Sequence, residues 1–262
     1  MRCLVLIAGG LLISLSVCGC EKKQEAPKES AEPAASAETT VTTQKEKEQE
    51  VAMDVSLQWL GHASFKITHG HTVIYIDPWK IKGSPHDATA VLVSHSHSDH
   101  YSSEDIAKVS GTNTKLLGPG DVIADEGNGE TITPGQKVDL PDVNVVGVAA
   151  YNLNKRFHPQ SQKWLGFVVE IAGKRIYYAG DTDATAEMKK LTQIDVAILP
   201  VGGTYTMNAA EAAQAVNEMK PRLAIPCHWG DIVGGRADAE KFAELADCEV
   251  KVLSPGETIS VP

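Results

Sequence analysis

The chain has 262 residues, of which 42% are hydrophobic, and its 24 lysines and arginines stand against 34 aspartates and glutamates, a formal net charge of −10. This acidic balance argues against a nucleic-acid-binding protein, because phosphate contacts require a basic surface. The length allows one large domain or two small ones, at roughly 100–200 residues per domain.

The amino-terminal residues predict an export signal. A short positive start precedes an almost wholly apolar run from 4 to 17, which has the length of a secretory signal and is short for a membrane-spanning helix. The run ends in Val-Cys-Gly-Cys, which resembles a bacterial lipobox with cleavage after Gly19 and lipid attached to Cys20. We therefore expect residues 1–19 to be a lipoprotein signal peptide. The protein would then be lipid-anchored in the cell envelope, with its domain in the periplasm or on the outer face of the membrane. A plain signal peptide with incidental cysteines is the alternative.

Residues 20–52 differ in composition from the segments on either side. After Cys20 the stretch contains no aromatic residue, leucine or isoleucine, and Glu, Lys, Ala, Ser and Thr dominate it. Such a stretch cannot bury enough apolar surface to offset the entropy lost on ordering. It predicts a flexible tether to a single folded domain over residues 53–262, which is long enough for a substantial core.

The first half of the folded segment is rich in strand signals. Apolar residues alternate with polar ones between 55 and 67, and residues 72–76 form a further β-rich run. The continuous apolar run 91–93 is expected of a strand buried on both faces. A helix is expected from Ser103, whose hydroxyl can cap it. Further strands are predicted at 115–117, 143–150, 166–171 and 175–179, with a Gly-Lys hairpin turn at 173–174.

The second half alternates helix and strand. Helices are predicted at 184–191, 208–219 and 237–246, and strands at 196–199, 223–226 and 250–253. Asn208 and Glu211 have the spacing of a capping box, which marks a helix start. A strand-rich first half and a βαβ-like second half imply an α/β architecture with helices outside a sheet core.

The densest chemical signal follows the predicted strand 91–93. Residues 94–100 are Ser-His-Ser-His-Ser-Asp-His, and three imidazoles and a carboxylate so close together suit zinc and related divalent ions. The pattern His-x-His-x-Asp-His after an apolar strand resembles the metallo-β-lactamase superfamily. The remaining positions of that family appear in the expected order, Asp77 before this motif and the others after it, each beside a predicted strand end: Asp77, His158, Asp181 and His228.

The resemblance covers residues 55–261 and implies an α/β fold, the four-layer αβ/βα sandwich of that superfamily. It also implies two divalent metal ions, with zinc expected and manganese or iron as alternatives. The implied ligands are His95, His97 and His158 for the first ion, Asp99, His100 and His228 for the second, and Asp181 between them. Asp77 would support the histidine loop by hydrogen bonding without binding metal.

Such a centre implies hydrolysis, with Asp99 and Asp181 as the catalytic carboxylates. Coordination lowers the pKa of a bound water from 15.7 to roughly 7, which supplies hydroxide at neutral pH. His97 stands where diiron oxygen-reducing relatives carry glutamate, and this difference favours hydrolysis over redox chemistry.

Residues 59–65, Trp-Leu-Gly-His-Ala-Ser-Phe, point to one branch of the superfamily. They resemble the branch of ascorbate-6-phosphate lactonases and N-acyl phosphatidylethanolamine phospholipase D, which implies a lactone, ester or phosphodiester as the small-molecule substrate. His62 either supports the metal site or is a packed turn histidine. Candidates for contacting substrate, because loops at strand ends carry specificity, are Tyr205, Trp164, Trp229 and Lys155.

Two functions from different classes remain open. The first is the hydrolase, and the second is a non-catalytic metal- or ligand-binding lipoprotein that retains the fold. The complete ligand set favours the hydrolase, and no nucleic-acid partner is expected. Cys227 and Cys248 are expected to be free thiols, because parallel strands would place them at opposite ends. Core packing is the expected role of Cys227.

Overall fold

The computed structural model describes residues 54–262. The predicted signal peptide, the lipidated Cys20 and the tether lie outside the described residues. Within the described part, no helix has the length and apolar character needed to cross a membrane.

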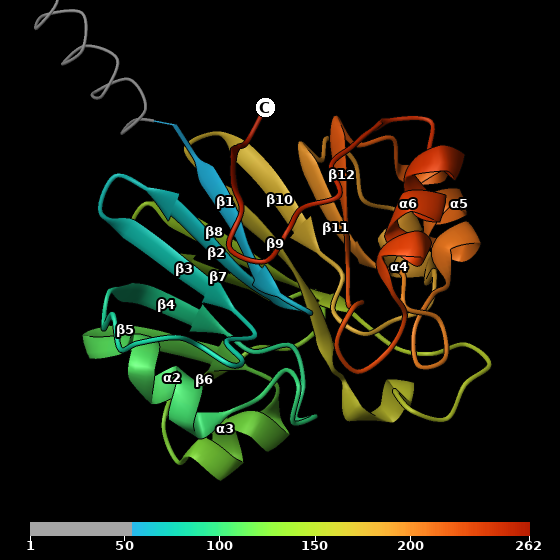
Figure 1. Ribbon diagram of the computed structural model, residues 1–262. Coiled ribbons are helices and arrows are strands. Elements are labelled where there is room, and N and C mark those ends of the chain that lie inside the picture. The colour runs from blue at the N-terminus through green and yellow to red at the C-terminus, as the bar shows by residue number, and fades with distance from the viewer. Residues whose placement is uncertain (1–53) are drawn as a thin grey trace, which may run out of the picture. The chain divides into compact units, whose positions relative to one another are not determined.

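Two seven-stranded sheets form the centre of the fold (Figure 1). In spatial order, the first sheet contains β14 (Thr258–Ser260), β1 (Ser56–Gly61), β2 (Ser64–His69), β3 (Thr72–Ile76), β4 (Ala88–Leu92), β5 (Ser110–Gly118) and β6 (Glu130–Thr131). The second contains β13 (Glu249–Val250), β12 (Leu223–Cys227), β11 (Val196–Pro200), β10 (Lys174–Tyr178), β9 (Leu165–Ile171), β8 (Val143–Ala149) and β7 (Lys137–Leu140).

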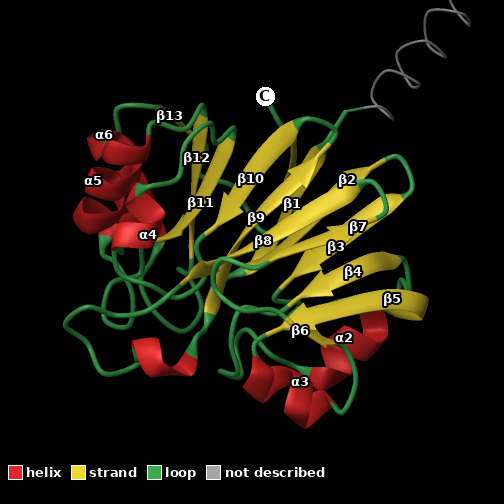
Figure 2. Ribbon diagram, turned by 180° about the vertical axis from the view of Figure 1, so that it is seen from behind, coloured by secondary structure: helices red, strands yellow, loops and turns green. Residues whose placement is uncertain are grey.

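Helices cover the outer faces of both sheets (Figure 2). The helices α2 (Ser103–Val109) and α3 (Gly120–Glu126) lie on the first sheet, and α4 (Ala186–Lys189), α5 (Ala209–Met219) and α6 (Arg236–Leu245) lie on the second. A 3₁₀ turn, Gln160–Gln162, precedes β9. This order of layers confirms the four-layer αβ/βα sandwich.

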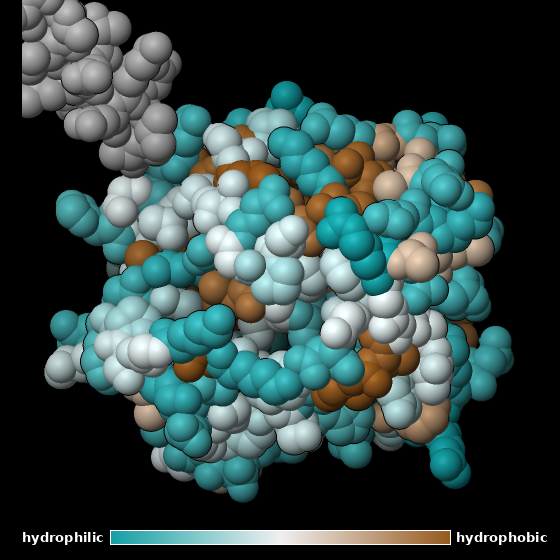
Figure 3. Space-filling model, in the orientation of Figure 1, coloured by the Kyte–Doolittle hydropathy of each residue, from teal (hydrophilic) through white to brown (hydrophobic). Residues whose placement is uncertain are grey.

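Strand β3 shows how the sequence separates the layers. All of its residues are buried, because both faces of the strand are covered. Ile74 and Ile76 belong to the central core between the sheets, whereas Val73 and Tyr75 pack in a second core beneath α2 and α3. The two-residue period of a strand sends alternate side chains to opposite faces, so one apolar run fills both cores. On the face seen in Figure 3, hydrophobic residues appear as separate patches among hydrophilic ones.

Parallel pairing brings the carboxyl ends of several strands together. β3 runs parallel to β4, and β10, β11 and β12 run parallel to one another. The ligand-type residues Asp77, His95, Asp181 and His228 lie just beyond the ends of β3, β4, β10 and β12 respectively. The order of strands in the sheets therefore collects chemically active side chains at one edge of the fold, as the sequence predicts.

Some elements differ from the expectation. The helix predicted at 184–191 covers only Ala186–Lys189. The hydroxyl of Thr185 caps its start, so the helix cannot begin at 184, and Met188 is the one residue that it buries. The strand predicted at 250–253 is reduced to Glu249–Val250, at the edge of the second sheet. The elements that the sequence analysis missed are α3, β6, β7 and β14.

Both cysteines of the domain are free, as expected. Cys227 ends β12 and Cys248 precedes β13, and these strands pair in parallel, so the thiols lie at opposite ends. Cys227 is packed in the central core, where burial raises the pKa of its thiol.

Candidate metal centre

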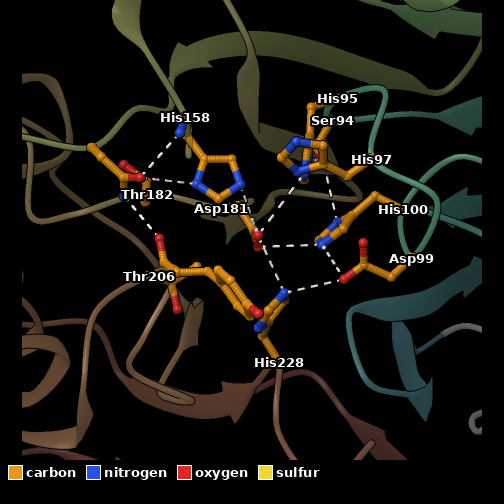
Figure 4. Close-up of polar contacts among 12 residues, drawn as sticks. Ser94, His95, His97, Asp99, His100, His158, Asp181, Thr182, Thr206 and His228 are labelled. Atoms are coloured by element: carbon orange, nitrogen blue, oxygen red, sulfur yellow. Dashed lines mark hydrogen bonds and ion pairs between the residues drawn. The ribbon is translucent and has the colours of Figure 1, made fainter. Parts of the chain in front are cut away.

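The loop after β4 is folded so that its histidines and aspartate gather at one point (Figure 4). Val93 continues the sheet by donating its N–H to Leu117. His97 then accepts two backbone hydrogen bonds, from the N–H groups of His100 and Tyr101, which close a tight turn. The loop ends where the hydroxyl of Ser102 caps α2. A sheet on one side and a capped helix on the other therefore fix the loop.

The remaining ligand-type residues come from three other loops. Asp181 follows Gly180, which has a φ of +64°. A side chain would not fit at position 180, because its Cβ would lie 2.5 Å from the carbonyl oxygen of Leu165. Asn152 holds His158 by accepting from its backbone N–H and contacting its Nδ1, both at 3.1 Å. His228 donates its backbone N–H to the carbonyl of His62.

Three of the residues at the site are non-glycine residues with left-handed backbone. The φ angles of His62, Asp77 and His228 are 49°, 45° and 57°. Such angles are uncommon outside glycine, although Asp and His adopt them more readily than most residues.

One group of four potential ligands is formed by His95, His97, His158 and Asp181, whose donor atoms all lie within 4.8 Å of one another. Nε2 of His158 lies 3.1 Å from Oδ2 of Asp181, and Nε2 of His95 lies 3.1 Å from Nδ1 of His97. All but His97 are buried. This is the set that the sequence assigned to a first ion, together with the carboxylate expected between the two ions.

A second group consists of His62, Asp99, His100 and His228, again with donor atoms within 4.8 Å. The Nε2 atoms of the three histidines lie 3.1, 3.6 and 3.5 Å from Oδ2 of Asp99. The sequence assigned three of these residues to a second ion and left the role of His62 open. The structure places His62 at the site, at a distance from Asp99 similar to those of the other two histidines.

Asp181 connects the two groups. Its Oδ2 lies 3.1 Å from Nε2 of His158 in the first group and 3.2 Å from Nε2 of His228 in the second. Its Oδ1 lies 3.3 Å from Nε2 of His100. One carboxylate is therefore close to ligand-type nitrogens from both sides.

Asp77 lies behind the histidine loop, fully buried. Its Oδ1 accepts from the backbone N–H of Ser94 at 2.7 Å, and its Oδ2 accepts from the Ser94 hydroxyl, the Tyr178 hydroxyl and Nδ1 of His100 at 2.5, 2.6 and 2.7 Å. It also lies within 4.8 Å of donor atoms of His95 and His100. Because four hydrogen bonds occupy its oxygens, Asp77 acts as a support that fixes His100 with Nε2 directed at the site.

Comparison with known proteins identifies the family of this site. A model of the beta-lactamase superfamily domain matches residues 56–228. A UPF0173 metal-dependent hydrolase from Pyrococcus abyssi is 35% identical over 228 residues, which make up the whole of that protein and 79% of this chain. The chain belongs to the UPF0173 family of metal-dependent hydrolases.

Solved structures agree with this assignment. A metal-dependent hydrolase from Parabacteroides distasonis aligns with this hydrolase at a TM-score of 0.68 and 26% identity, over 75% of this chain and 91% of that one. Igni18, a metallo hydrolase from the archaeon Ignicoccus hospitalis, aligns at 0.64 and 26%, over 78% and 97%. The metallo-β-lactamase fold that the histidine motif predicted is confirmed.

The two carboxylates of the hydrolase are held in their ionised form. Burial alone would raise the pKa of Asp181, but the charges of His228 and His100 outweigh it and hold this pKa well below the usual range. Burial also opposes ionisation of Asp99, yet hydrogen bonds with His228 and His62 lower its pKa. Ionised carboxylates are the form that binds cations.

The histidines divide by their electrostatic surroundings. Burial lowers the pKa of His95, His97 and His62, so these imidazoles are neutral and able to ligate metal. For His228, burial alone would lower the pKa, but the charge of Asp181 raises it to about 9. Asp181 likewise raises the pKa of His100 against the effect of burial.

Several buried atoms of the centre lack a hydrogen-bond partner. They include Nε2 of His100, His158 and His228 and Oδ1 of Asp181. Buried polar atoms normally have hydrogen-bond partners, and four unsatisfied polar atoms converging on one place need an explanation. Divalent cations would supply it, because imidazole nitrogens and carboxylate oxygens are their protein ligands. The residues present therefore fit the metal dependence of the family.

The centre opens into a cavity of about 340 Å³. Its polar floor is formed by ligand-type residues, and its walls are Phe157, Tyr205 and Ile232. Ile232 is 49% exposed, and Tyr205 packs edge-on against Phe157 with ring centroids 4.8 Å apart. Of the four residues that the sequence proposed for substrate contact, only Tyr205 lines this cavity.

The other three residues proposed to contact substrate lie elsewhere. Trp164 is buried beneath the centre, with its ring centroid 5.0 Å from that of His95 and 4.9 Å from that of His97. Lys155 forms an ion pair of 2.6 Å with Asp183. Trp229 lines a different cavity.

Sequence reasoning missed the two apolar walls. Phe157 directly precedes the ligand-type His158, which was a usable signal. Ile232 lies beside Val233 in the glycine-rich run 230–235, and apolar residues among glycines are typical of an exposed binding loop.

Proposed function

We propose that this hydrolase uses two divalent metal ions to cleave a lactone, ester or phosphodiester bond in a small molecule. The observation that carries the proposal is the convergence of two four-residue ligand groups on Asp181, at the floor of one cavity. The resemblance of residues 59–65 to the lactonase and phospholipase D branch supports this range of substrates.

The first ion would be held by His95, His97 and His158, and the second by Asp99, His100 and His228, with Asp181 between them. His62 joins the second set through its contact with Asp99. Zinc suits these nitrogen and oxygen donors, and manganese or iron is compatible with them. When bound, the ions would supply Lewis-acid activation of water and stabilisation of the negative charge that develops at the scissile bond.

The protein's own contribution begins with Asp99, which lines the cavity and is proposed to orient the attacking water and steer its proton. Its side chain is 15% exposed, so a water molecule can reach it, and its lowered pKa keeps it ionised at neutral pH. His62 orients this carboxylate through the 3.1 Å contact. Asp99 can therefore accept a hydrogen bond from the attacking water and steer its proton.

The walls of the cavity would position the substrate. Phe157, Tyr205 and Ile232 offer apolar surface on which the non-reacting part of a small molecule can pack. Such packing holds the scissile bond over the ligand-type residues, which is the proximity contribution to catalysis.

We further propose that the domain is attached to a cell-envelope membrane through lipid on Cys20. Support comes from the lipobox-like sequence and from the family match, which begins at residue 56 and so leaves the amino-terminal segment as an addition to the shared domain. Fractionation of cells expressing Cys20→Ser tests this. Retention of that variant in the membrane fraction would contradict lipid anchoring.

A metal and substrate assay on the full chain tests the catalytic proposal. Elemental analysis should find close to two ions per chain, and a panel of lactones, esters and phosphodiesters should show turnover that Asp181→Ala abolishes. Asp139→Ala removes an exposed carboxylate and is the matched control. One ion per chain with full activity would refute the dinuclear centre. Tight metal binding without turnover of any panel member would favour the non-catalytic binding protein instead.

A further inference from the structure

The loop that leads to His158 is held by a buried carboxylate outside the metal centre. Asp183 is 7% exposed, belongs to neither ligand group and does not line the cavity of the centre. Its Oδ2 accepts from the backbone N–H of Leu153 at 2.8 Å, and its Oδ1 pairs with Lys155 at 2.6 Å. A buried charge is costly even when it is paired, so the position of Asp183 beside this loop needs a reason.

Asp183 also fixes the orientation of a buried amide. Asn152 is 7% exposed, and its Nδ2 donates to Oδ1 of Asp183 at 3.3 Å and to the carbonyl of Tyr205 at 3.0 Å. Both partners are acceptors, so the nitrogen of the amide must face them. The oxygen of the amide then faces His158, where it accepts the backbone N–H at 3.1 Å. Three hydrogen bonds therefore agree on one orientation of Asn152.

This orientation determines where His158 carries its ring proton. The Nδ1 atom lies 3.1 Å from Oδ1 of Asn152, and the Nε2 atom lies 3.1 Å from Oδ2 of Asp181. The amide oxygen cannot donate, so an unprotonated Nδ1 would place two lone pairs against each other. Nδ1 must therefore carry a proton while Asn152 is held as it is. Without Asn152, the carboxylate of Asp181 would instead hold the proton on Nε2, which is the nitrogen directed at the metal centre.

We propose that Asn152, oriented by Asp183, is a positioning residue that holds the proton of His158 on Nδ1 and so leaves Nε2 to bind metal. The inference rests on the proposed hydrolase, in which His158 holds the first ion. Lys155 completes the chain of contacts, because its ammonium group pairs with Asp183 and keeps that carboxylate in place. Partners of this kind fix the ring orientation and the tautomer of a histidine ligand.

Nitrogen NMR of the full chain, labelled at histidine and free of metal, tests the proton position. Protonated and unprotonated ring nitrogens have different chemical shifts, and loss of the signals in His158→Gln assigns them. We expect a protonated Nδ1 in the wild type. Asn152→Leu removes the amide while nearly keeping its volume, and in this variant the proton should move to Nε2. The control Asn154→Leu makes the same change at an exposed asparagine of the same loop and should leave the proton on Nδ1.

Competition with a chelating dye measures the effect on zinc. Asn152→Leu should weaken the binding of one zinc ion by about 10–100-fold. Asp183→Ala should weaken it by about tenfold, a smaller effect because the Tyr205 carbonyl still holds the amide. Asn154→Leu should match the wild type. A thermal melt of each variant checks that it is folded, and Asp183→Ala provides the test if Asn152→Leu does not fold.

Several results would overturn the proposal. One is an unprotonated Nδ1 in the wild type, and another is a proton that stays on Nδ1 in folded Asn152→Leu. Unchanged zinc affinity in folded Asn152→Leu or Asp183→Ala would also overturn it, as would an equal loss in Asn154→Leu. The proton position is measured without metal or substrate, so a wild type that turns over no substrate would refute the hydrolase separately from this inference.

Discussion

Replacing Asp77 with asparagine should weaken metal binding although Asp77 is not one of the proposed metal ligands. The carboxylate accepts four hydrogen bonds, and the one from Nδ1 of His100 fixes which ring nitrogen carries the proton. In Asp77→Asn the amide nitrogen must face some of these donors. The Ser94 and Tyr178 hydroxyls can rotate to accept, but His100 can accept at Nδ1 only by moving its proton to Nε2. A protonated Nε2 cannot ligate a cation.

The magnitude follows from which of the four hydrogen bonds the amide can re-form. Supports of this kind, when removed, typically reduce metal affinity by about 10–100-fold, and we expect a decrease in that range. A hydrogen bond to a charged group contributes about 1.5–3 kcal/mol to stability. Without the one from His100, and with the others partly re-formed, the free energy of unfolding of the metal-free protein should fall by about 2 kcal/mol.

Competition with a chelating dye measures the metal affinity, and urea unfolding measures the stability. Tyr178→Phe is the matched control, because it removes a donor to the same oxygen and leaves the hydrogen bond from His100 to Asp77 in place. It should lower stability by about 1 kcal/mol and leave metal affinity within threefold of wild type. Equal loss of metal affinity in both variants, or none in Asp77→Asn, would refute the tautomer argument.

Three further predictions concern the centre itself. His62→Gln should reduce the affinity for one ion by about 10–100-fold and bring the metal content below two ions per chain. An unchanged metal content would mean that His62 only packs in the turn and does not support the metal site. Gly180→Ala should destabilise the domain by more than about 2 kcal/mol and abolish activity. The reason is that the new Cβ would lie 2.5 Å from the Leu165 carbonyl oxygen and displace Asp181. A stable, active variant would contradict this clash. Against the effect of burial, Asp181 raises the pKa of His228 to about 9. Below that pH a cation must displace this proton, so zinc affinity should fall as pH drops from 9 to 7, and a flat profile would contradict the assignment.

The sequence predicted the positions of the ligand-type residues better than the lengths of the elements. Buried strands such as β4 and β12 are short apolar runs, and the chemistry begins where each run stops, so His95 and His228 could be placed from pattern alone. The two-residue strand β13 could not be sized in this way, because its pairing depends on an edge of the sheet that no local pattern records.

Side-chain partners distant in sequence decided the remaining roles. Trp164 looked available for substrate, but its ring N–H donates to Asp121, 43 residues away, and its ring packs under the metal centre. Lys155 is similarly committed to Asp183. His62 could be either a turn residue or part of the site until the fold placed it beside Asp99. Such pairings are tertiary facts, and one sequence without its fold does not contain them.

The left-handed backbone at His62, Asp77 and His228 has a consequence for how this protein folds. Each conformation is unfavourable in an isolated peptide and persists only where surrounding structure enforces it. His62 directly follows β1 of the first sheet and His228 directly follows β12 of the second, and one backbone hydrogen bond joins them. The centre therefore cannot assemble before the two sheets dock. Metal affinity would then appear late in refolding, and the rate of its appearance would report the final docking step rather than the formation of either sheet.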